Sequence, residues 1–543
     1  MVRKLIYSLI FPFCFIYCYV LGYNIINYGT YSYGLKIINP YTILAFVLLS
    51  LCCFILYSKL DKIENSIFNI KVFPIIDKLF FQNNSKSFWF CFLLISICHL
   101  PAFLAYFPGI FTYDTMYQIE FFVNNDYREI HPLLHNFIIY GVFLFSKIFK
   151  TSWGGVFLHT IFQSFIMISI YSYCIIFLSK YNTTKIIRLF ALLFFAFYPT
   201  NQVFSLIATK DVLFSGAVLL MIMLLYRYND ELKNSINSKN TSIALILTIT
   251  FVMLIRYNGL LAYIICVPFL LYYFRKYIKH SFIVFIVPLV FISLFYLIKL
   301  SVGIEPPYIS SMLSVPLQQM GRVRIYQSNE LSSNDINTYK TLVSAKNEYN
   351  YDAFCVDYLK MDDLESSKCD YLENSLKENY KQIIPLYFKW AKKYPTVYID
   401  AFLMLNLKYW SVNAIYERYE LYYYLYTDNR WDNYFGVPIR MQSLLPKLKN
   451  YYDKIFIENY FNKSPLTYFL FSIAWNTWTV FFLMLILFFQ KRYNCIISLI
   501  MIPAIFITLN FGAIALLRYI YIDFLIIPLL IAFTFGGMNK EKF

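Results

Sequence analysis

The sequence predicts an all-α integral membrane protein with about 12–14 transmembrane helices and a mostly helical, water-facing insertion. Hydrophobic residues make up 59% of its 543 residues and charged residues only 14%, far fewer than in soluble domains. Apolar runs that reach or approach the roughly 20 residues of a membrane span recur along the chain. Backbone groups inside lipid must bond within their own segment, and no alternating strand pattern is present, so we expect helices. A soluble enzyme is excluded.

The expected spans form two groups, an N-terminal module over residues 1–300 and C-terminal helices over residues 466–543. Arg3 and Lys4 precede the first apolar run without a small-residue cleavage site, so we interpret that run as a retained helix rather than a signal peptide. The spans are expected roughly at 5–26, 41–58, 88–107, 133–149, 154–178, 187–207, 212–228, 242–259, 260–274, 281–299, 466–489, 495–514 and 519–536.

The positive charge of the chain indicates its topology rather than a nucleic-acid partner. The net charge is +16, but the basic residues stand in short clusters between apolar runs and not along one face. Under the positive-inside rule these clusters face the cytoplasm. The stretch from Lys59 to Lys86 is then inside, and the loop at 108–132 is outside. We expect membrane lipid around the spans and no nucleic acid as a partner.

One segment leaves the topology open. Lys147 before it, and Lys180 and Arg188 after it, all favour the cytoplasm, which requires an even number of crossings between them. Residues 154–178 are therefore interpreted either as one span or as a short helical hairpin or re-entrant pair.

The insertion at 301–465 is expected to form a separate extracytoplasmic domain. It is long enough for a small domain, and amphipathic stretches at 380–393 and 398–410 favour helices. Cys355 and Cys369 lie in this insertion, where they either form a disulfide or remain thiols. Most other cysteines fall in or beside apolar runs, where a thiol behaves as a small hydrophobic group.

The loop at 108–132 gathers carboxylates on the predicted outer side. Pro108 and Gly109 end the third span, and after them Asp114 and Gln118 share one face of a predicted helix. A carboxylate at the membrane surface can act as a general base on a hydroxyl. The alternative is that Asp114 caps a helix or is a solvated loop charge. The His131-Pro132 pair, which opens the next span, favours a functional role.

Two further motifs place charges against apolar segments. Lys210-Asp211 abuts two apolar runs, where charges are costly unless they lie at an interface or in a water-filled cavity. Its alternative is a plain connecting loop. Arg256 stands within an apolar stretch, where it either extends to the interface or binds a phosphate through its bidentate donors.

Other charged or ligating residues are given structural roles. Arg518 and Asp523 are five positions apart, so they do not share a helical face, and we expect each to pair elsewhere or meet the interface. Single histidines without partner spacing do not predict a metal site; these are His99, His159 and His280.

Together these residues resemble the GT-C superfamily of membrane glycosyltransferases, which includes protein mannosyltransferases and aminoarabinose transferases. In that superfamily an acidic residue lies in the first large outer loop, and a basic-Pro-Pro-Leu type motif opens the next helix. Asp114 matches the acid, and Arg128–Leu133 is a departed version of the second motif. An uncharacterised bacterial branch of multi-pass proteins is more similar still, in the order Pro-Gly-x4-Asp-x3-Gln, His131-Pro132, Thr209-Lys210-Asp211 and Pro316-Leu-Gln-Gln319.

The resemblance implies a GT-C-like fold and a multi-pass protein of the bacterial cytoplasmic membrane whose active site lies on the extracytoplasmic side. The donor would be a polyprenyl-phosphate sugar, and the acceptor an envelope glycan, lipid or protein. Asp114 would deprotonate the acceptor hydroxyl, with inversion at the anomeric carbon, while Lys210 and Arg256 bind the phosphate. The remaining substrate-binding candidates are Gln118, His131, Asp211, Gln318 and Gln319.

Cofactor use and two rival functions stay open at this point. The outer-loop acid is single, whereas some GT-C members have a pair that holds a divalent ion, so a divalent metal is not required but is left open. A surface-polysaccharide polymerase or ligase would differ in its donor more than in its architecture. A lipid-linked sugar flippase or transporter would carry its charges mid-membrane and show two related halves, which the sequence does not display.

Overall fold

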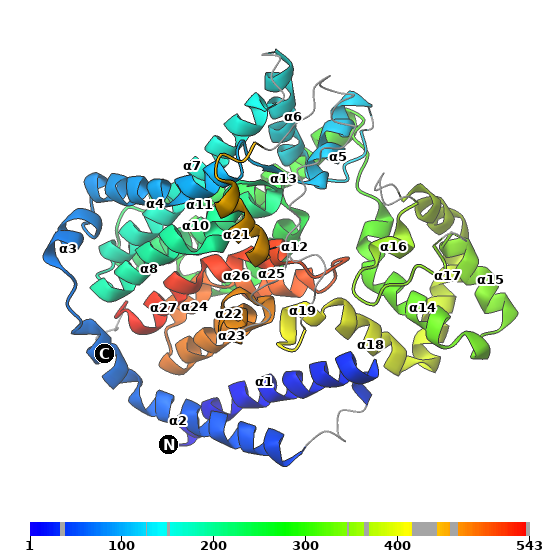
Figure 1. Cartoon of the computed structure of the whole chain (residues 1–543), viewed down its shortest axis with the longest axis horizontal. Helices are drawn as coiled ribbons and strands as arrows, with labels where there is room; N and C mark the ends of the chain where they lie inside the picture. The colour runs from blue at the N-terminus through cyan, green and yellow to red at the C-terminus, as the bar shows by residue number, and fades with distance from the viewer. Residues whose placement is uncertain are drawn as a thin grey trace.

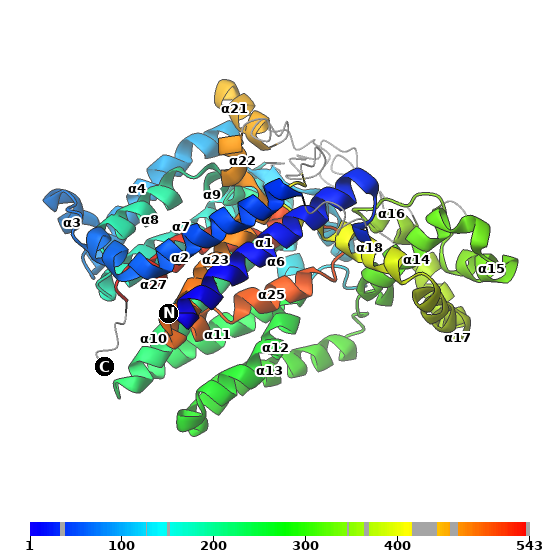
Figure 2. The ribbon, with the colours of Figure 1, turned by 90° about the horizontal axis from the view of Figure 1, so that it is seen from below.

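A bundle of helices with a helical outgrowth at one end makes up the computed structural model (Figures 1 and 2). The structure describes residues 1–32, 39–125, 127–148, 153–344, 347–362, 369–414, 442–456 and 465–538. The parts of the expected insertion at 345–346, 363–368, 415–441 and 457–464 lie outside the described residues. Within the described ranges the strands are limited to two of two residues each, so the prediction of an all-α membrane protein is confirmed.

The helices before the outgrowth are α1 (Val2–Tyr28), α2 (Pro40–Phe68), α3 (Pro74–Phe80), α4 (Ser85–Ala105), α5 (Tyr113–Val123), α6 (Leu133–Ile148), α7 (Gly154–Lys180), α8 (Lys185–Phe197), α9 (Pro199–Phe204), α10 (Lys210–Lys233), α11 (Lys239–Ile255), α12 (Tyr257–Tyr273) and α13 (Ile278–Ser301). The outgrowth and its connections hold α14 (Ser314–Tyr326), α15 (Ser333–Leu342), α16 (Asp357–Lys360), α17 (Asp370–Lys393), α18 (Pro395–Leu405), α19 (Leu407–Trp410) and α21 (Pro446–Phe456). The chain then returns through α22 (Pro465–Phe471), α23 (Ile473–Gln490), α24 (Tyr493–Ser498), α25 (Met501–Leu509), the 3₁₀ turn η6 (Leu517–Ile520), α26 (Tyr521–Leu525) and α27 (Ile527–Phe535).

Eight helical stretches among the described residues are long and apolar enough to cross a membrane. Large apolar side chains on their outer faces are exposed, for example Phe13 at 62%, Ile97 at 65% and Leu297 at 61%. A soluble protein avoids exposed apolar surface of this extent, whereas lipid chains cover it in a membrane. The chain is therefore a multi-pass membrane protein.

Several expected spans are shorter or broken in the structure. The expected span at 187–207 ends at Phe197, because Pro199 begins a separate short helix, α9. The one at 495–514 divides into α24 and α25. Three others correspond to helices of 16 or 17 residues, namely α6, α11 and α12. The structure thus supports eight spans by length and composition, and the total of about 12–14 spans stays a prediction.

The segment that left the topology open is one helix. The helix α7 runs without a break from Gly154 to Lys180, so the hairpin and re-entrant alternatives are wrong. Its length of 27 residues corresponds to about 40 Å, which suffices to cross a bilayer once.

The helix α10 is the centre of the bundle. In its apolar window 89% of the residues are buried, against 22% in each of α1, α2 and the stretch that contains α13. Gly216 makes close packing possible there, because a Cβ on it would lie 2.6 Å from the sulfur of Met167 on α7. The residues at the beginning of α10 are therefore enclosed by protein and not by lipid.

A pair of short parallel strands joins the loops before α5 and before α10. The strand β1 (Ile110–Phe111) pairs with β2 (Ile207–Ala208), in the register Ile110 to Ile207 and Phe111 to Ala208. Parallel strands run in the same direction, so the residues that follow them emerge at the same edge. This pairing brings the start of α5 beside the start of α10.

The outgrowth has an apolar core of its own, formed by α14 to α18. Figure 1 shows it at the end of the molecule away from the N-terminus and α27. Arg322 of the outgrowth donates to the Gly29 carbonyl after α1 at 2.5 Å, and Asp400 accepts from the Tyr31 amide at 2.7 Å. The backbone amide of Val356 donates to the carbonyl of Ala513, shortly before η6. These bonds attach the outgrowth to the N-terminal helix α1 and to the C-terminal segment before η6.

Candidate functional site

Asp114 lies in the first turn of α5 and contacts two cations from distant segments. The Lys210 Nζ is 3.3 Å and the Arg518 Nη1 3.0 Å from the same oxygen, Oδ2 of Asp114. The side chain of Asp114 is only 7% exposed. A carboxylate near a helix N-terminus is stabilised by the helix dipole, and here two cations add to that effect.

Asp211 forms the second centre of the site, in the first turn of α10. Arg256 Nη1 lies 3.1 Å from its Oδ1, and Arg518 Nε lies 3.7 Å from its Oδ2. Asp211 is fully buried, yet neither of its oxygens has a well-aligned hydrogen bond among the described residues. Arg518 connects the two carboxylates, and we call the six residues Asp114, His131, Lys210, Asp211, Arg256 and Arg518 the ion-pair cluster.

Arg256 enters the cluster because the helix breaks at its position. It has extended backbone angles, φ −156° and ψ 133°, between the end of α11 and the start of α12. Its guanidinium lies over the ring of Tyr519, 4.7 Å from the centroid, and also donates to the carbonyl of that residue at 3.1 Å. Arg256 is 5% exposed, so its side chain is enclosed by protein and not extended along the outer surface of the bundle.

His131 contributes a neutral imidazole with a defined tautomer. The ammonium of Lys210 can only donate, and it lies 3.1 Å from Nδ1 of His131, so Nδ1 accepts and Nε2 carries the hydrogen. That Nε2 is buried and has no hydrogen-bond partner among the described residues. His131 therefore presents an unused N–H donor beside Lys210.

The loop that carries His131 is fixed at its base by a second ion pair. Glu129 contacts Lys299 of α13, and its Oε1 also accepts from the backbone amide of Leu133 at 2.9 Å, at the start of α6. The backbone on either side of Arg128 pairs with Glu305 after α13. These contacts hold His131 in place from the end of α13.

Burial and the neighbouring cations act on Asp114 in opposite directions. Burial raises the pKa of Asp114, whereas Arg518 and then Lys210 lower it, and the cations prevail, so this pKa is held well below its ordinary range. Burial first and Lys210 second lower the pKa of His131 to about 3. At neutral pH the cluster holds an ionised Asp114 and a neutral His131. Among the described residues, the three cations of the cluster face two carboxylates, an excess of one positive charge.

The three glutamines predicted as substrate-binding residues form hydrogen bonds away from the ion-pair cluster. Gln118 is on α5 with Asp114, but its Nε2 lies 2.7 Å from Nδ1 of His135 and donates to Asn136 at 3.1 Å. Gln318 donates to the carbonyl of Asp352, and Gln319 bonds Tyr387 and the carbonyl of Tyr398, all within the outgrowth. Among the described residues, the hydrogen-bond partners of these three glutamines therefore lie outside the ion-pair cluster.

Sequence reasoning missed Arg518. Its spacing from Asp523 predicts a structural role, with a partner other than Asp523 or a place at the interface, whereas Arg518 contacts both carboxylates of the cluster. The available signal was a cation at the start of the last apolar segment, where a charge requires a partner. Asp523 does lie apart, and accepts from Thr477 at 3.4 Å.

Two further expectations concern sulfur and metal. Cys355 is a buried free thiol, so it forms no disulfide with Cys369 in this structure. Within the part of the chain that the structure describes, no group of three or more His, Cys, Asp or Glu side chains has the geometry of a metal site.

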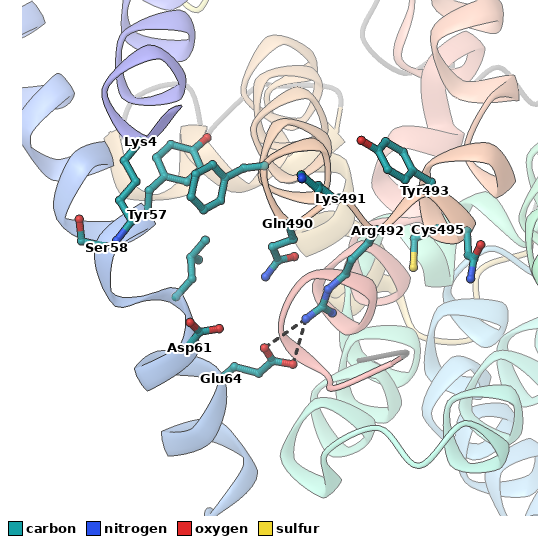
Figure 3. A pocket seen from close by; sticks show the side chains of 13 residues that line it. Lys4, Tyr57, Ser58, Asp61, Glu64, Gln490, Lys491, Arg492, Tyr493 and Cys495 are labelled. Carbon is teal, nitrogen blue, oxygen red and sulfur yellow. Dashed lines mark hydrogen bonds and ion pairs between the residues drawn. The ribbon is translucent and has the colours of Figure 1, made fainter. Parts of the chain in front are cut away.

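The polar pocket in Figure 3 is distinct from the cluster. Its lining residues come from α1, α2, α23, α24 and the turn between the last two, and none of them belongs to the ion-pair cluster.

Comparison with known proteins identifies the family. A model described as a family of unknown function (DUF6020) matches residues 128–511, which is more than half of the chain. The chain belongs to DUF6020. The match contains His131, Lys210, Asp211 and Arg256, while Asp114 and Arg518 lie outside the matched residues of this DUF6020 member. A search of the curated proteins and a search of the solved structures each found no match.

Asp211→Asn is expected to destabilise the protein strongly. The substitution leaves Arg256 buried without its carboxylate, which typically costs about 3–5 kcal/mol. In Asp211→Asn combined with Arg256→Gln, the loss should be smaller than the sum of the two single losses, because the unpaired charge is also removed. Thermal unfolding in detergent measures these values.

Asp77→Asn serves as the control for this cycle. Asp77 pairs with Lys185, whose side chain is 48% exposed, so at most about 1 kcal/mol should be lost. Strictly additive losses at positions 211 and 256 would contradict the pairing.

His131→Gln is expected to reduce the acid sensitivity of the fold. The unfolded histidine has a pKa near 6.5 and folded His131 has one of about 3, so the unfolded chain binds more protons between these values. Stability is therefore lost as the pH falls from 6.5 towards 3, and glutamine removes this contribution, which is at most about 1.4 kcal/mol per pH unit. The melting temperature, followed from about pH 7.5 to pH 5, reports the difference.

The exposed His280, changed to Gln, provides the control and should retain the wild-type dependence. If His131→Gln lost stability with acid as steeply as wild type, His131 would not be held neutral by its surroundings.

Proposed function

We propose that this DUF6020 member is a membrane glycosyltransferase. It transfers a sugar from a polyprenyl-phosphate donor to a cell-envelope acceptor at the outer face of the bacterial cytoplasmic membrane. Asp114 takes the proton of the acceptor hydroxyl, the hydroxyl oxygen forms a bond to the anomeric carbon with inversion, and the bond from that carbon to the phosphate oxygen breaks. The released product is the polyprenyl phosphate.

The observation that supports this proposal most is the convergence of three cations on one carboxylate pair. Lys210, Arg256 and Arg518 come from three separate segments, and each has an exposed side-chain fraction of 14% or less. Burying three cations is costly, and the described carboxylates balance only two of them. A leaving phosphate supplies the missing negative charge and gains donors placed where its charge develops.

The excess of one positive charge suits a phosphodiester. Such a group carries one negative charge at neutral pH, as in a sugar linked through phosphate to a prenyl alcohol. The N–H at Nε2 of His131 adds a neutral donor, from which an oxygen of the phosphate or of the sugar can accept a hydrogen bond. Binding of the polyprenyl-phosphate sugar then neutralises the excess positive charge and gives the His131 N–H an acceptor.

The same cations explain how Asp114 becomes a base only when donor is present. While Lys210 and Arg518 contact its Oδ2, the low pKa makes Asp114 a weak proton acceptor. A phosphodiester competes for both cations. As it draws them away, burial dominates and the pKa of Asp114 rises, so the carboxylate gains basicity beside the bound donor.

Asp114→Asn is expected to abolish the envelope glycosylation. General-base catalysis contributes about 100-fold or more, so cells that carry only the variant should have lost most of the sugar modification. The measurement is the glycan composition of the envelope in a strain whose own gene is deleted, complemented with wild type or variant. Membrane fractions show whether equal amounts of both proteins are present.

Glu330→Gln is the matched control, because this exposed carboxylate lies on the outgrowth. It should restore wild-type modification. Full modification with Asn at position 114 would exclude the general-base role.

Binding of a prenyl phosphodiester is expected to be coupled to proton uptake. Citronellyl methyl phosphodiester does not titrate near neutral pH, so protons taken up from about pH 5 to pH 6 must bind to the protein. Calorimetry in buffers of different ionisation enthalpy measures this number. Wild type should take up a fraction of a proton, Asp114→Asn none, and Lys210→Gln should bind the probe about tenfold or more weakly.

Unchanged affinity in Lys210→Gln would exclude the phosphate-binding role of Lys210. Binding without proton uptake in wild type would show that the anion does not release Asp114 from its cations, and this outcome is independent of the acceptor and sugar used by cells.

A further inference from the structure

A polar pocket lies between the first two helices and the C-terminal helices (Figure 3). Lys4 lines it, so the pocket is at the end of the bundle that carries the N-terminus. Its volume is about 560 Å³. One wall comes from α1 and α2 and the other from the end of α23 and the start of α24. Lys233, at the far end of α10 from Lys210, donates to the pocket residue Asn494 at 2.6 Å. Because α10 has 24 residues, the pocket is about 35 Å from the ion-pair cluster along that helix.

The pocket opens where the apolar surface of the first two helices ends. Leu5 and Ile6 follow Lys4 on α1 and are 52% and 51% exposed, and Ile55, just before Tyr57 on α2, is 51% exposed. Beyond them the lining becomes polar. In a membrane protein this transition marks the level of the lipid headgroups. The positive-inside rule predicts that this level belongs to the cytoplasmic leaflet.

Two of the charged lining residues, Arg492 and Glu64, pair with each other. Arg492 donates from Nη2 to both oxygens of Glu64, at 3.0 and 3.1 Å (Figure 3). Its Nη1 donates to the carbonyl of Phe533. Both side chains of the pair are nearly buried. Their opposite charges cancel, so the remaining charges of the lining are those of Lys4, Lys491 and Asp61.

The lining also contains two buried polar atoms that no group in the described part of the chain satisfies. Tyr57 is 2% exposed, and its hydroxyl has no hydrogen-bond partner among the described residues. Gln490 donates from Nε2 to the carbonyl of Thr534, which leaves its Oε1 as a buried acceptor that no described group satisfies. A buried polar group without a partner costs about 1–3 kcal/mol, so such atoms indicate a ligand.

These groups divide into donors and acceptors. Lys4, Lys491 and the Tyr57 hydroxyl can donate to an anion, whereas the Asp61 carboxylate and Gln490 Oε1 can accept from a cation. Figure 3 shows Asp61 and Gln490 on opposite walls of the same space. A purely anionic ligand would satisfy the donors but be repelled by Asp61, and a purely cationic one would be repelled by the lysines.

We propose that this pocket binds the zwitterionic phosphoethanolamine headgroup of a membrane lipid. The phosphate lies between Lys4 and Lys491 and accepts from Tyr57, and the ammonium donates to Asp61 and Gln490. The lipid chains lie along the exposed apolar faces of α1 and α2. This site does not depend on the proposed glycosyl transfer, and no residue of the ion-pair cluster takes part in it.

The test compares short-chain lipids on the full-length protein in detergent. Dihexanoyl phosphatidylethanolamine should raise the melting temperature in a saturable way and bind about fivefold or more tightly than dihexanoyl phosphatidylglycerol, since one partly exposed ion pair is worth about that factor. In Asp61→Asn the two lipids should bind about equally. Lys4→Gln combined with Lys491→Gln should weaken both.

Lys62→Gln is the matched control, because Lys62 is an exposed charge next to Asp61 that does not line the pocket. It should leave the lipid preference unchanged. Equal binding of the two lipids by wild type, or a preference that survives Asp61→Asn, would overturn the proposal. Free phosphoethanolamine is the third probe. If it raised the melting temperature as much as dihexanoyl phosphatidylethanolamine does at the same concentration, the ligand would be a soluble aminoalkyl phosphate, and the proposal of a lipid headgroup would be overturned.

Discussion

The ion pairs of Asp114 and Asp211 are the constraint on which the arrangement of the membrane region depends. Each carboxylate is buried, and each neutralises cations that come from other segments of the chain. An uncompensated charge in such surroundings costs several kcal/mol, so the segments that carry these charges must meet. The start of α5, the start of α10, the junction of α11 and α12, and the turn η6 are thereby held around one point.

Irregular backbone at this point is what makes the convergence possible. Two strands of two residues align the loops before α5 and α10, and a break at Arg256 turns one apolar stretch into two helices. Membrane proteins tolerate such breaks only where protein encloses them, and here the buried beginning of α10 provides that enclosure. The cluster therefore joins charged side chains from separate segments of the chain on a backbone that these contacts fix.

The helices α1 and α10 connect the regions at opposite ends of the bundle, and the outgrowth bonds to α1 and to the segment before η6. Val356 of the outgrowth bonds Ala513, five residues before Arg518, and Arg322 bonds the end of α1 at Gly29. The helix α1 begins at the polar pocket, and α10 extends from the ion-pair cluster to that pocket.

The sequence alone determined the membrane-embedded helical class, because apolar composition and run length leave a chain in lipid no other option. It also predicted Asp114, Lys210 and Arg256 as candidate site residues, because a charge beside an apolar run is costly unless it has a partner or a ligand. Only the tertiary structure decided which charges meet. Arg518 joins Asp114 across most of the chain, through contacts that no local pattern encodes, while the glutamines at 118, 318 and 319 bond elsewhere. Sequence periodicity reports which face of a helix is apolar, but pairing between buried charges depends on how the helices pack.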